Sequence, residues 1–542
     1  MNSAQKVLIM RCDQYDPDRI SNLIKEGMEE LGVKPSGRVL LKPNVVIAHP
    51  EIFPNAFTRS EFLDGAISAT ILKAADTEEI AVGERSGITL PTRWTFKNAG
   101  YSKVLKKHKV KVHFFDEERQ VPVPLHNKQS LRDNIFVPES IAACSFLINL
   151  PKFKAHPWCR LTLSLKNFIG IQDDRHRLVD HNIFLEQKIA DLQEVIQPKF
   201  IAVDAIIAGQ KTMLTPTPFD MGAIIMGTNS CAVDTVCCHM VNVDPKEVIH
   251  LKYASERGFG PMDISEIDVA GDYPLEEIQE KTHDFQFLME PIDSYFADKE
   301  NLNVNVGVFP EAHSPNYCWG GCPGALQEAM HIFHAYYPDV YEKMKKVRYV
   351  VGKVDKPLDL DLDEKVIFVG NCTSWEGDID GKHVTIESSY KAPKEVNERK
   401  TKSNDLLLKT FMSVSKSLRN RNKRYLHVKG CTVSVGDHVH FLSVLAGIKN
   451  VNFDPRMVIP LNIAYWQMRI MRFINRFKPR VSIVREKMTQ AFPKIRSKLD
   501  RREGYPQHTD RRLTHMPGFS PERRSGSERR SLAQRRQLGP AF

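Results

Sequence analysis

The sequence predicts an α/β protein with two folded domains, the first built on a mostly parallel sheet flanked by helices. A chain of 542 residues exceeds what a single hydrophobic core supports. Short apolar runs alternate with helix-length segments through the first half, a pattern typical of parallel sheets covered by helices. A stretch rich in Glu, Lys and Asp at about 273–303 interrupts this alternation before it restarts. We therefore expect a domain boundary in that stretch.

The first domain is expected to span residues 1–272. Apolar runs typical of short strands lie at residues 7–10, 39–41, 80–82, 110–115, 146–148, 200–203 and 223–226. Apolar residues at helical spacing predict helices over about 62–71 and 96–105, which fall between the early strands. Because strands and helices alternate, we expect most of the strands to lie parallel, with the helices covering the sheet.

A smaller α/β domain with cysteine-bearing loops is expected over residues 303–451. Its predicted strands lie at residues 304–309, 348–351, 366–369 and 427–428. The charged stretch at 391–404 is interpreted as a loop that opens a helix.

An amphipathic basic helix is predicted over residues 460–490. Its apolar face carries Ile463, Trp466, Ile470, Ile474 and Phe477, and the opposite face carries Arg469, Arg472 and Arg476. We expect the apolar face to pack on the second domain. The alternative is a peripheral membrane contact through residues 460–480, in which the apolar face enters a bilayer interface and the arginines meet anionic headgroups.

The end of the chain, residues 500–542, is polar, arginine-rich and poor in aliphatic residues, so we expect a disordered tail. Ten arginines against four acidic residues in 501–542 account for +6 of the formal net charge of +10. The remaining chain is close to neutral, and we expect no nucleic-acid partner.

Neither the N-terminus nor the apolar runs predict export or a membrane span. No run of eighteen uncharged apolar residues occurs, and the start of the chain lacks the long apolar region of a signal peptide. Ten cysteines are few for a disulfide-built secreted protein of this size. These features predict a cytoplasmic protein.

Three polar clusters follow predicted strand ends, where open α/β sheets form their ligand crevices. They supply the candidate substrate-binding residues Lys42, Asn44, Arg85, Thr162 and Asn167 and the candidate catalytic residues Lys154, His156 and Lys166. Cations, an imidazole and a hydroxyl that converge on one crevice would suit a carboxylate or phosphate. Each residue by itself is equally consistent with a turn, a helix end or a solvated surface.

Taken together, these clusters resemble the signature of the family called domain of unknown function 362. The resemblance is carried by Asn149–His156, Thr162, Leu165–Asn167 and Gly170, by the earlier Lys42-Pro43-Asn44, and by Val203-Asp204 and Ala232-Val233-Asp234. It covers about residues 5–272. The family usually has Asp-Pro before Ala-Val-Asp, whereas Asn229 and Ser230 stand here. The resemblance implies iron–sulfur association in some members and supplies no settled reaction.

Four cysteines of the second half lie beside glycines in candidate loops, namely Cys318, Cys322, Cys372 and Cys431. The last two follow predicted strands. If these loops meet at one sheet edge, the four thiolates would satisfy a [4Fe–4S] cluster. Zinc and four unligated thiols are the alternatives, although structural zinc prefers two close cysteine pairs.

The order of these cysteines resembles the small subunit of nickel–iron hydrogenases, which has a close pair, then a cysteine after a strand, then a late cysteine. The first gap is three residues here, where that family usually has two, and Thr432 follows the last cysteine where it usually has proline. The resemblance implies a cluster-binding domain.

These observations favour an iron–sulfur oxidoreductase or electron-transfer protein. Its [4Fe–4S] cluster would exchange electrons between a partner protein and a small anionic substrate held by the first domain. Lys154 and Lys166 would neutralise the substrate's charge, and His156 would donate a proton near neutral pH. The alternatives are a non-redox enzyme of small anionic metabolites and a membrane-surface or partner-binding scaffold.

Overall fold

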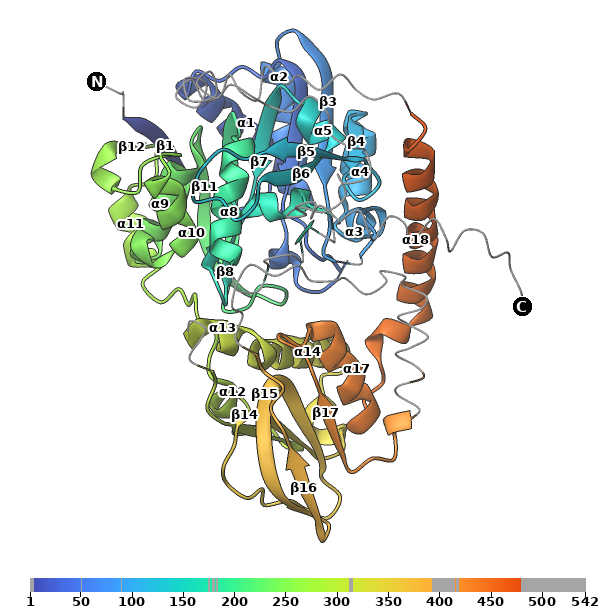
Figure 1. Cartoon of the computed structure of the whole chain (residues 1–542). Coiled ribbons are helices and arrows are strands. Elements are labelled where there is room, and N and C mark those ends of the chain that lie inside the picture. Colours follow the sequence, from blue (N-terminus) through green and yellow to red (C-terminus); the bar gives the residue numbers. More distant parts are fainter. Residues whose placement is uncertain are drawn as a thin grey trace, which may run out of the picture.

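The computed structural model describes residues 4–478, except positions 50, 89, 174–175, 178–180, 182–183, 311–314, 392–414 and 416–418. It contains two sheets, each covered by helices, which confirms the predicted α/β class (Figure 1). The predicted tail at 500–542, the part of the predicted helix beyond residue 478, and nearly all of the predicted loop at 391–404 lie outside the described residues.

The larger sheet belongs to the first half of the chain. Its main path runs in the order β12 (Ile267–Ala270), β1 (Gln5–Arg11), β11 (Thr217–Gly227), β10 (Phe200–Gln210), β7 (Phe146–Leu150), β2 (Gly37–Pro43), β3 (Thr77–Glu84) and β4 (Lys111–Phe114). Two short strands extend it beside β10, namely β8 (Lys152–His156) and β9 (Arg160–Thr162). The pairs from β10 to β4 are all parallel, so these strands end at one common edge.

Helices cover both faces of this sheet, because side chains alternate between the faces along each strand. Leu40 and Leu41 are neighbours in β2 and lie in two different hydrophobic cores. The core that contains Leu40 also takes in residues of α8 (Leu185–Val195), α9 (Ser230–Met240) and α10 (Ile249–Glu256). The core that contains Leu41 takes in residues of α1 (Pro17–Glu30), α2 (Ser60–Lys73) and α4 (Tyr101–His108).

The helix predicted over 96–105 is wrong, because the structure has two helices there. α3 (Thr92–Asn98) ends before Gly100, and α4 begins at Tyr101. Gly100 has φ +79°, a left-handed conformation that ends a helix and that glycine adopts without steric cost. The apolar spacing continued across a break that the glycine imposes.

The smaller sheet is formed by β13 (Leu302–Val306), β14 (Val347–Lys353), β15 (Lys365–Ile379), β16 (Lys382–Ile386) and β17 (Tyr425–Val428). All its pairs are parallel except β15 with β16. α14 (Cys322–Tyr336) and α17 (Val435–Leu445) pack on this sheet in one core. Figure 1 shows α13 (Pro315–Gly320) and α14 between the two sheets, so this layer faces the first domain.

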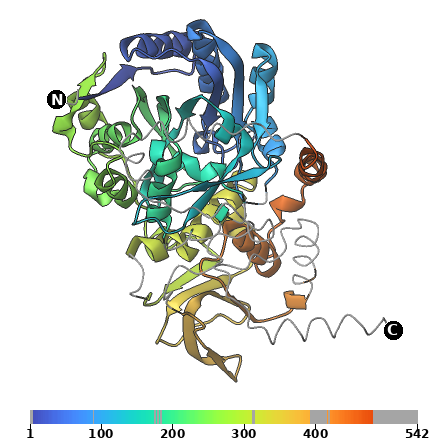
Figure 2. The same ribbon diagram turned by 45° about the horizontal axis from the view of Figure 1, so that its top comes forward.

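The expected packing of the amphipathic helix is also wrong. α18 (Pro455–Asn475) runs along the rim of the first domain, where Figure 2 shows it end-on. It buries Ala464, Tyr465 and Met468 rather than the predicted apolar face. Its last turns are held to the first domain by hydrogen bonds from Arg472 to Asp116 O and from Asn475 Nδ2 to Glu117 O.

No helix among the described residues has the length and apolarity needed to cross a bilayer.

Candidate functional site

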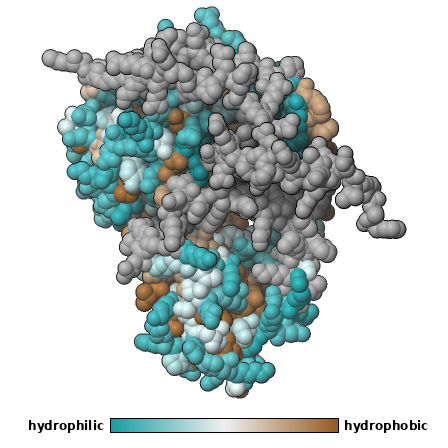
Figure 3. Space-filling model, viewed as in Figure 1, coloured by the Kyte–Doolittle hydropathy of each residue, from teal (hydrophilic) through white to brown (hydrophobic). Residues whose placement is uncertain are grey.

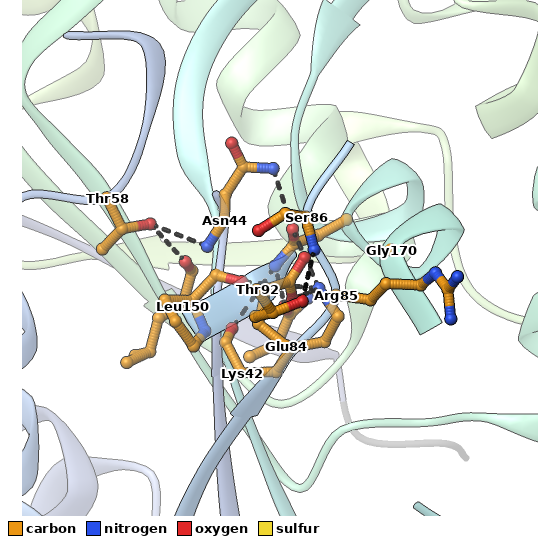
Figure 4. A network of polar contacts seen from close by, with 12 residues as sticks. Lys42, Asn44, Thr58, Glu84, Arg85, Ser86, Thr92, Leu150 and Gly170 are labelled. Atoms are coloured by element: carbon orange, nitrogen blue, oxygen red, sulfur yellow. Dashed lines mark hydrogen bonds and ion pairs between the residues drawn. The ribbon is translucent and has the colours of Figure 1, made fainter. Parts of the chain in front are cut away.

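Lys42, at the end of β2, forms an ion pair with Glu84, at the end of the neighbouring strand β3 (Figure 4). Lys42 Nζ also donates to Asn167 Oδ1 at 3.3 Å, and the same oxygen accepts Asn44 Nδ2 at 3.0 Å. Three predicted binding residues therefore meet at the carboxyl edge of the sheet, as expected from their positions after strands. They bind one another and Glu84, and we call them the Lys42 network.

The pKa values in this network follow from complete burial. Burial raises the pKa of Glu84 to about 7, against the opposing effect of Lys42, and burial lowers the pKa of Lys42. Glu84 was missing from the predicted site residues, although it follows a strand in the same way as Lys42. A Cβ on Gly170 would overlap Glu84 Oε1 and lie 3.1 Å from Lys42 Nζ, so a larger residue here would displace the ion pair.

Arg85 follows Glu84, and its guanidinium points away from the Lys42–Glu84 pair (Figure 4). The loop that carries Arg85 is fixed by Arg177, which donates to Ser86 O at 2.6 Å, Arg85 O at 3.3 Å and Gly170 O at 3.1 Å. Arg177 thus ties the end of β3 to the turn after Asn167.

Lys154, on β8, is also buried but has different partners. Its Nζ donates to Ala56 O at 2.7 Å and to Met213 O at 3.1 Å. Burial and the nearby charge of Lys166 lower the pKa of Lys154 to about 7. Lys42 pairs with Glu84 while Lys154 binds two carbonyls, so these two lysines have no partner in common.

His156, at the end of β8, is held as a neutral imidazole. Its Nδ1 accepts the backbone N–H groups of Trp158 and Cys159, both at 3.2 Å, so the ring proton sits on Nε2. Burial, followed by the charges of Lys166 and Lys154, lowers its pKa well below the usual value. His156 therefore offers a neutral N–H hydrogen-bond donor at pH 7.

Lys166, on α6 (Ser164–Asn167), lies in the same electrostatic environment as Lys154 and His156. Burial lowers its pKa. Thr162 pairs with Lys154 across β8 and β9. Within the described part of the chain, Thr162 Oγ1 is buried and has no hydrogen-bond partner. These four residues form the second group, which we call the Lys154 group.

Short α6 is positioned by Asp234 of α9. The Asp234 carboxylate accepts the backbone N–H of Ser164 at 2.8 Å and of Leu165 at 3.0 Å, so it caps the helix that carries Lys166 and Asn167. Burial raises the pKa of Asp234 to about 7, although both N–H groups oppose this. The Ala-Val-Asp element thus has a structural role that places a candidate cation.

Lys152 is another buried cation, and its ammonium group already has an ion-pair partner and a hydrogen-bond partner. Lys152 Nζ lies 2.9 Å from Asp204 Oδ1 and donates to Tyr15 Oη at 2.8 Å, while the Tyr15 hydroxyl donates to the same carboxylate oxygen at 2.7 Å. Arg59 N donates to the other carboxylate oxygen at 3.0 Å. This closed set of contacts joins β8 to β10 and leaves Asp204 a structural residue.

The second domain reaches the Lys154 group through α14. The Glu328 carboxylate accepts the N–H groups of Met213 and Leu214 at 2.9 and 2.8 Å, in the same loop whose carbonyl binds Lys154. Burial raises the pKa of Glu328 to about 7. Sequence reasoning missed Glu328, because a lone glutamate within an amphipathic helix carries no signal for a contact with another domain.

The four predicted cysteine ligands gather at one end of the second domain. The Sγ atoms of Cys322 and Cys372 lie 3.6 and 3.5 Å from the point that a Cβ on Gly370 would occupy. Asn371 N donates to Gly430 O at 2.9 Å, which joins the loops of Cys372 and Cys431. Burial, followed by the nearby thiols Cys372 and Cys431, raises the pKa of Cys318 to about 12.

At least one of these thiols already accepts a backbone hydrogen bond. Val433 N donates to Cys322 Sγ at 3.4 Å. Burial raises the pKa of Cys322 to about 12, and the other three thiols contribute in the same direction. All ten cysteines lie among the described residues, and none of them forms a disulfide. Among the residues that the structure describes, no three His, Cys, Asp or Glu side chains form a compact site ready for one metal ion.

The turn that carries Cys318 and Cys322 lies against the first domain. A Cβ on Gly320, in the turn between Cys318 and Cys322, would overlap Pro157 and lie 2.7 Å from Trp158 Cδ1. Pro157 and Trp158 directly follow His156 in the chain. The cysteine turn of the second domain is therefore in contact with the two residues that directly follow His156.

The large open groove of the molecule lies elsewhere. It has a volume of about 1190 Å³ and runs between α18 and the edge of the first sheet. Its charged residues include Arg93 paired with Glu117 and Arg119 paired with Glu139, and it contains none of the predicted site residues. We do not assign it to the candidate site.

With this geometry described, the comparisons with known proteins bear on the first domain. Residues 39–239 match the family model described as "Domain of unknown function (DUF362)". The DUF362 region contains the Lys42 network, the Lys154 group and Asp234, whereas the four cysteines of the second domain lie outside it. The resemblance of that domain to hydrogenase small subunits stays a prediction.

A thylakoid-associated protein from Synechocystis sp. is 23% identical over 274 residues, which are 47% of this chain and 81% of that protein. The lactate racemase apoprotein from Thermoanaerobacterium thermosaccharolyticum is similar at 9% identity and a TM-score of 0.27, over 69% of this chain and 84% of that chain. A protein from Thermotoga maritima shows the same identity and TM-score over 65% of this chain and 75% of its own. Likeness this distant says nothing about a shared reaction.

Proposed function

We propose that this protein is an iron–sulfur redox protein that acts on a small anionic substrate beside the Lys154 group. Cys318, Cys322, Cys372 and Cys431 would hold a [4Fe–4S] cluster. The observation that carries the proposal is the contact of the Cys318–Cys322 turn with Pro157 and Trp158. A redox centre at the thiols would lie close to a substrate at His156 and Lys166, where electron transfer needs no large movement.

The residues of the thiol group fit a cluster in their chemistry. Thiolates are the usual ligands of such clusters, and N–H donors to sulfur, such as Val433 N, tune their reduction potential. Four sulfurs around one zinc ion would lie about 4 Å apart, since each Zn–S bond is about 2.3 Å. Zinc is the alternative ion for the same four thiolates, and metal analysis distinguishes the two.

The protein's own residues have distinct roles in this proposal. Lys166 would attract the anion and Thr162 Oγ1 would donate a hydrogen bond to it, since this hydroxyl is buried and has no partner among the described residues. His156 Nε2–H would orient the substrate as a neutral donor. Lys42 is excluded from the substrate set, because Glu84 neutralises it. A bound cluster would supply one-electron transfer from a partner protein, which is oxidised, to the substrate, which is reduced.

A non-redox acid–base enzyme is the second candidate. It is favoured by four buried groups whose pKa values lie at about 7, namely Lys154, Glu84, Asp234 and Glu328. Groups with such pKa values can give and take protons at neutral pH. Under this alternative the four thiols stay unligated.

Metal analysis of the full chain, purified without oxygen, decides between the candidates. The proposal expects about four irons per chain with broad visible absorbance. Single Ser replacements at Cys318, Cys322, Cys372 and Cys431 should each remove most of the iron. Cys237→Ser is the matched control, because Cys237 is a buried free thiol of α9 in the first domain. A wild-type chain without iron after anaerobic reconstitution, or variants that retain it, would contradict the redox function.

The anion site is tested separately with inorganic phosphate as the probe. Loss of one charge-assisted contact costs about 1.5–3 kcal/mol, so Lys166→Met should weaken phosphate binding by about tenfold or more. Lys103→Met, an exposed lysine on α4, is the control and should bind like the wild type. Equal phosphate affinity of Lys166→Met and wild type would remove Lys166 from the site.

A further inference from the structure

The outward face of α18 is a continuous apolar stripe. Its members are Ile459, Ile463, Trp466, Ile470, Phe473, Ile474 and Phe477, which are 43–74% exposed. Spacings of three and four residues keep them on one side of the helix. The face toward the first domain is occupied by Ala464, Tyr465 and Met468, so the stripe does not serve the fold. Large apolar stripes left in water mark interaction surfaces.

Along this helix and the three residues after it, the charges are all positive. From Pro455 to Lys478 the sequence contains no acidic residue, and the cations are Arg456, Arg469, Arg472, Arg476 and Lys478. Arg469 stacks over the Trp466 ring with its guanidinium carbon 5.5 Å from the ring centroid. An exposed tryptophan flanked by cations is typical of helices that lie in the headgroup layer of a membrane.

The helix is positioned to reach a flat surface. It stands at the rim of the molecule in both ribbon views (Figures 1 and 2), and apolar side chains show at its upper end in the space-filling view (Figure 3). Hydrogen bonds from Arg472 and Asn475 to the first domain hold its inner face. Among the described residues, the outer face of the helix is therefore left exposed.

We propose that α18 docks this protein onto the surface of an anionic lipid bilayer. The helix lies in the interface, with the stripe entering the acyl boundary and the cations meeting lipid phosphates and carboxylates. A second copy of the chain is a poorer occupant, since two such helices would bring arginines against arginines with no acidic residue to pair them. Charge complementarity thus selects the anionic surface.

Flotation of the full chain with vesicles tests the proposal. Binding is expected to vesicles of phosphatidylcholine with phosphatidylserine, to fall at high salt, and to be weak with phosphatidylcholine alone. The combined change Ile463→Ser, Ile470→Ser and Phe477→Ser should weaken binding by about tenfold or more. These side chains are exposed, so the fold should persist, and Leu362→Ser, an apolar residue 92% exposed on the second domain, is the matched control.

Two further measurements exclude other occupants. Trp466 fluorescence should shift to the blue on adding anionic vesicles, and Trp466→Phe should abolish that shift while flotation persists. Binding by the triple Ser variant that equals wild type would overturn the proposal, because the arginine-rich segment after residue 478 would then suffice. A wild-type dimer that becomes monomeric in the triple variant, without vesicle binding by either, would assign the stripe to a second copy.

Discussion

Lys42 and Glu84 form a buried ion pair between neighbouring parallel strands, with side chains that are 0% and 2% exposed. The pair lies at the carboxyl edge of the first sheet, where open α/β sheets bind ligands. Asn167 and Gly170 close over it. The residues that the sequence assigned to an anion thus hold the edge of the sheet together.

Removing one member of this pair should be costly. Glu84→Gln leaves a buried ammonium without its counter-ion, and we expect the free energy of unfolding to fall by about 3–5 kcal/mol. The double variant Lys42→Met with Glu84→Gln should lose less than the single variants together, since no charge remains. Urea denaturation of the three variants measures this coupling.

The control for these Lys42 and Glu84 variants is an exposed ion pair on the same two strands. Arg38 Nε lies 3.0 Å from Glu78 Oε2, with both side chains largely in water. Glu78→Gln should change the free energy of unfolding by less than about 1 kcal/mol. A cost for Glu84→Gln as small as this would show that Lys42 finds another partner.

Asp234→Asn should loosen α6. The carboxylate accepts two backbone N–H groups, and the amide oxygen of Asn satisfies only one of them while its NH₂ faces the other. We expect the free energy of unfolding to fall by about 1–3 kcal/mol. The measurement is the denaturation midpoint, with Asp263→Asn as the control, because Asp263 caps an exposed turn with Ser265. Equal effects at the two positions would contradict the role of Asp234.

Glu328 should give stability a pH dependence of known sign. Burial raises its pKa from 4.5 to about 7 in the folded protein, so the folded state binds this proton more tightly than the unfolded state. Its contribution to stability is therefore present at low pH and is lost as pH rises from about 4.5 through 7. The full effect is on the order of 3 kcal/mol, and Glu328→Gln should remove it.

His331, on the same helix, should act in the opposite direction. Burial lowers its pKa from 6.5 to about 4, and its ring nitrogens contact Thr215 Oγ1 at 2.9 Å and Tyr295 Oη at 2.8 Å. Its contribution to stability is present above pH 6.5 and is lost as pH falls through 4. Denaturation from pH 4 to 8 should show this slope clearly in Glu328→Gln and much less in Glu328→Gln with His331→Gln. An unchanged slope in the double variant would exclude His331 as its source.

The contact between the cysteine turn and the first domain should be sensitive to one methyl group. Gly320→Ala would overlap Pro157 and press on Trp158, so we expect a loss of stability of about 1–3 kcal/mol and a change in tryptophan fluorescence. Gly436→Ala is the control, because a Cβ at that position in α17 meets only Ser434 Oγ at 3.8 Å. The control should be neutral or slightly stabilising, by up to about 1 kcal/mol.

The residues themselves already indicated which strand ends are polar. Lys42, Glu84 and Asn149 each lie in the last two residues of a parallel strand, and the strand-like runs alone predicted that Lys42 lies at a sheet edge. The partner of each of these side chains could not be predicted from the sequence. Whether Lys42 meets an anion or Glu84 depends on which strand lies next to β2, and strand order is a long-range property.

The packing of helix α18 also could not be predicted from the sequence alone. Periodicity correctly predicted an apolar face on α18, but it could not say which face the rest of the molecule would cover. The opposite face packs on the first domain, through three buried residues and the hydrogen bonds of Arg472 and Asn475. The spacing of apolar residues is a property of one helix, whereas packing depends on the surface that a second element offers.

The order of the amino acids was enough to establish the α/β class, the strand ends that carry polar residues and the thiols placed beside glycines. These are local properties, set by apolar spacing and by turn residues within a few positions along the chain. The tertiary structure was needed to establish that Glu84 neutralises Lys42, that His156 is neutral, and that the turn at Gly320 lies against Trp158. Charge state and contact across domains depend on burial and on neighbours far away in the chain, which no local pattern encodes.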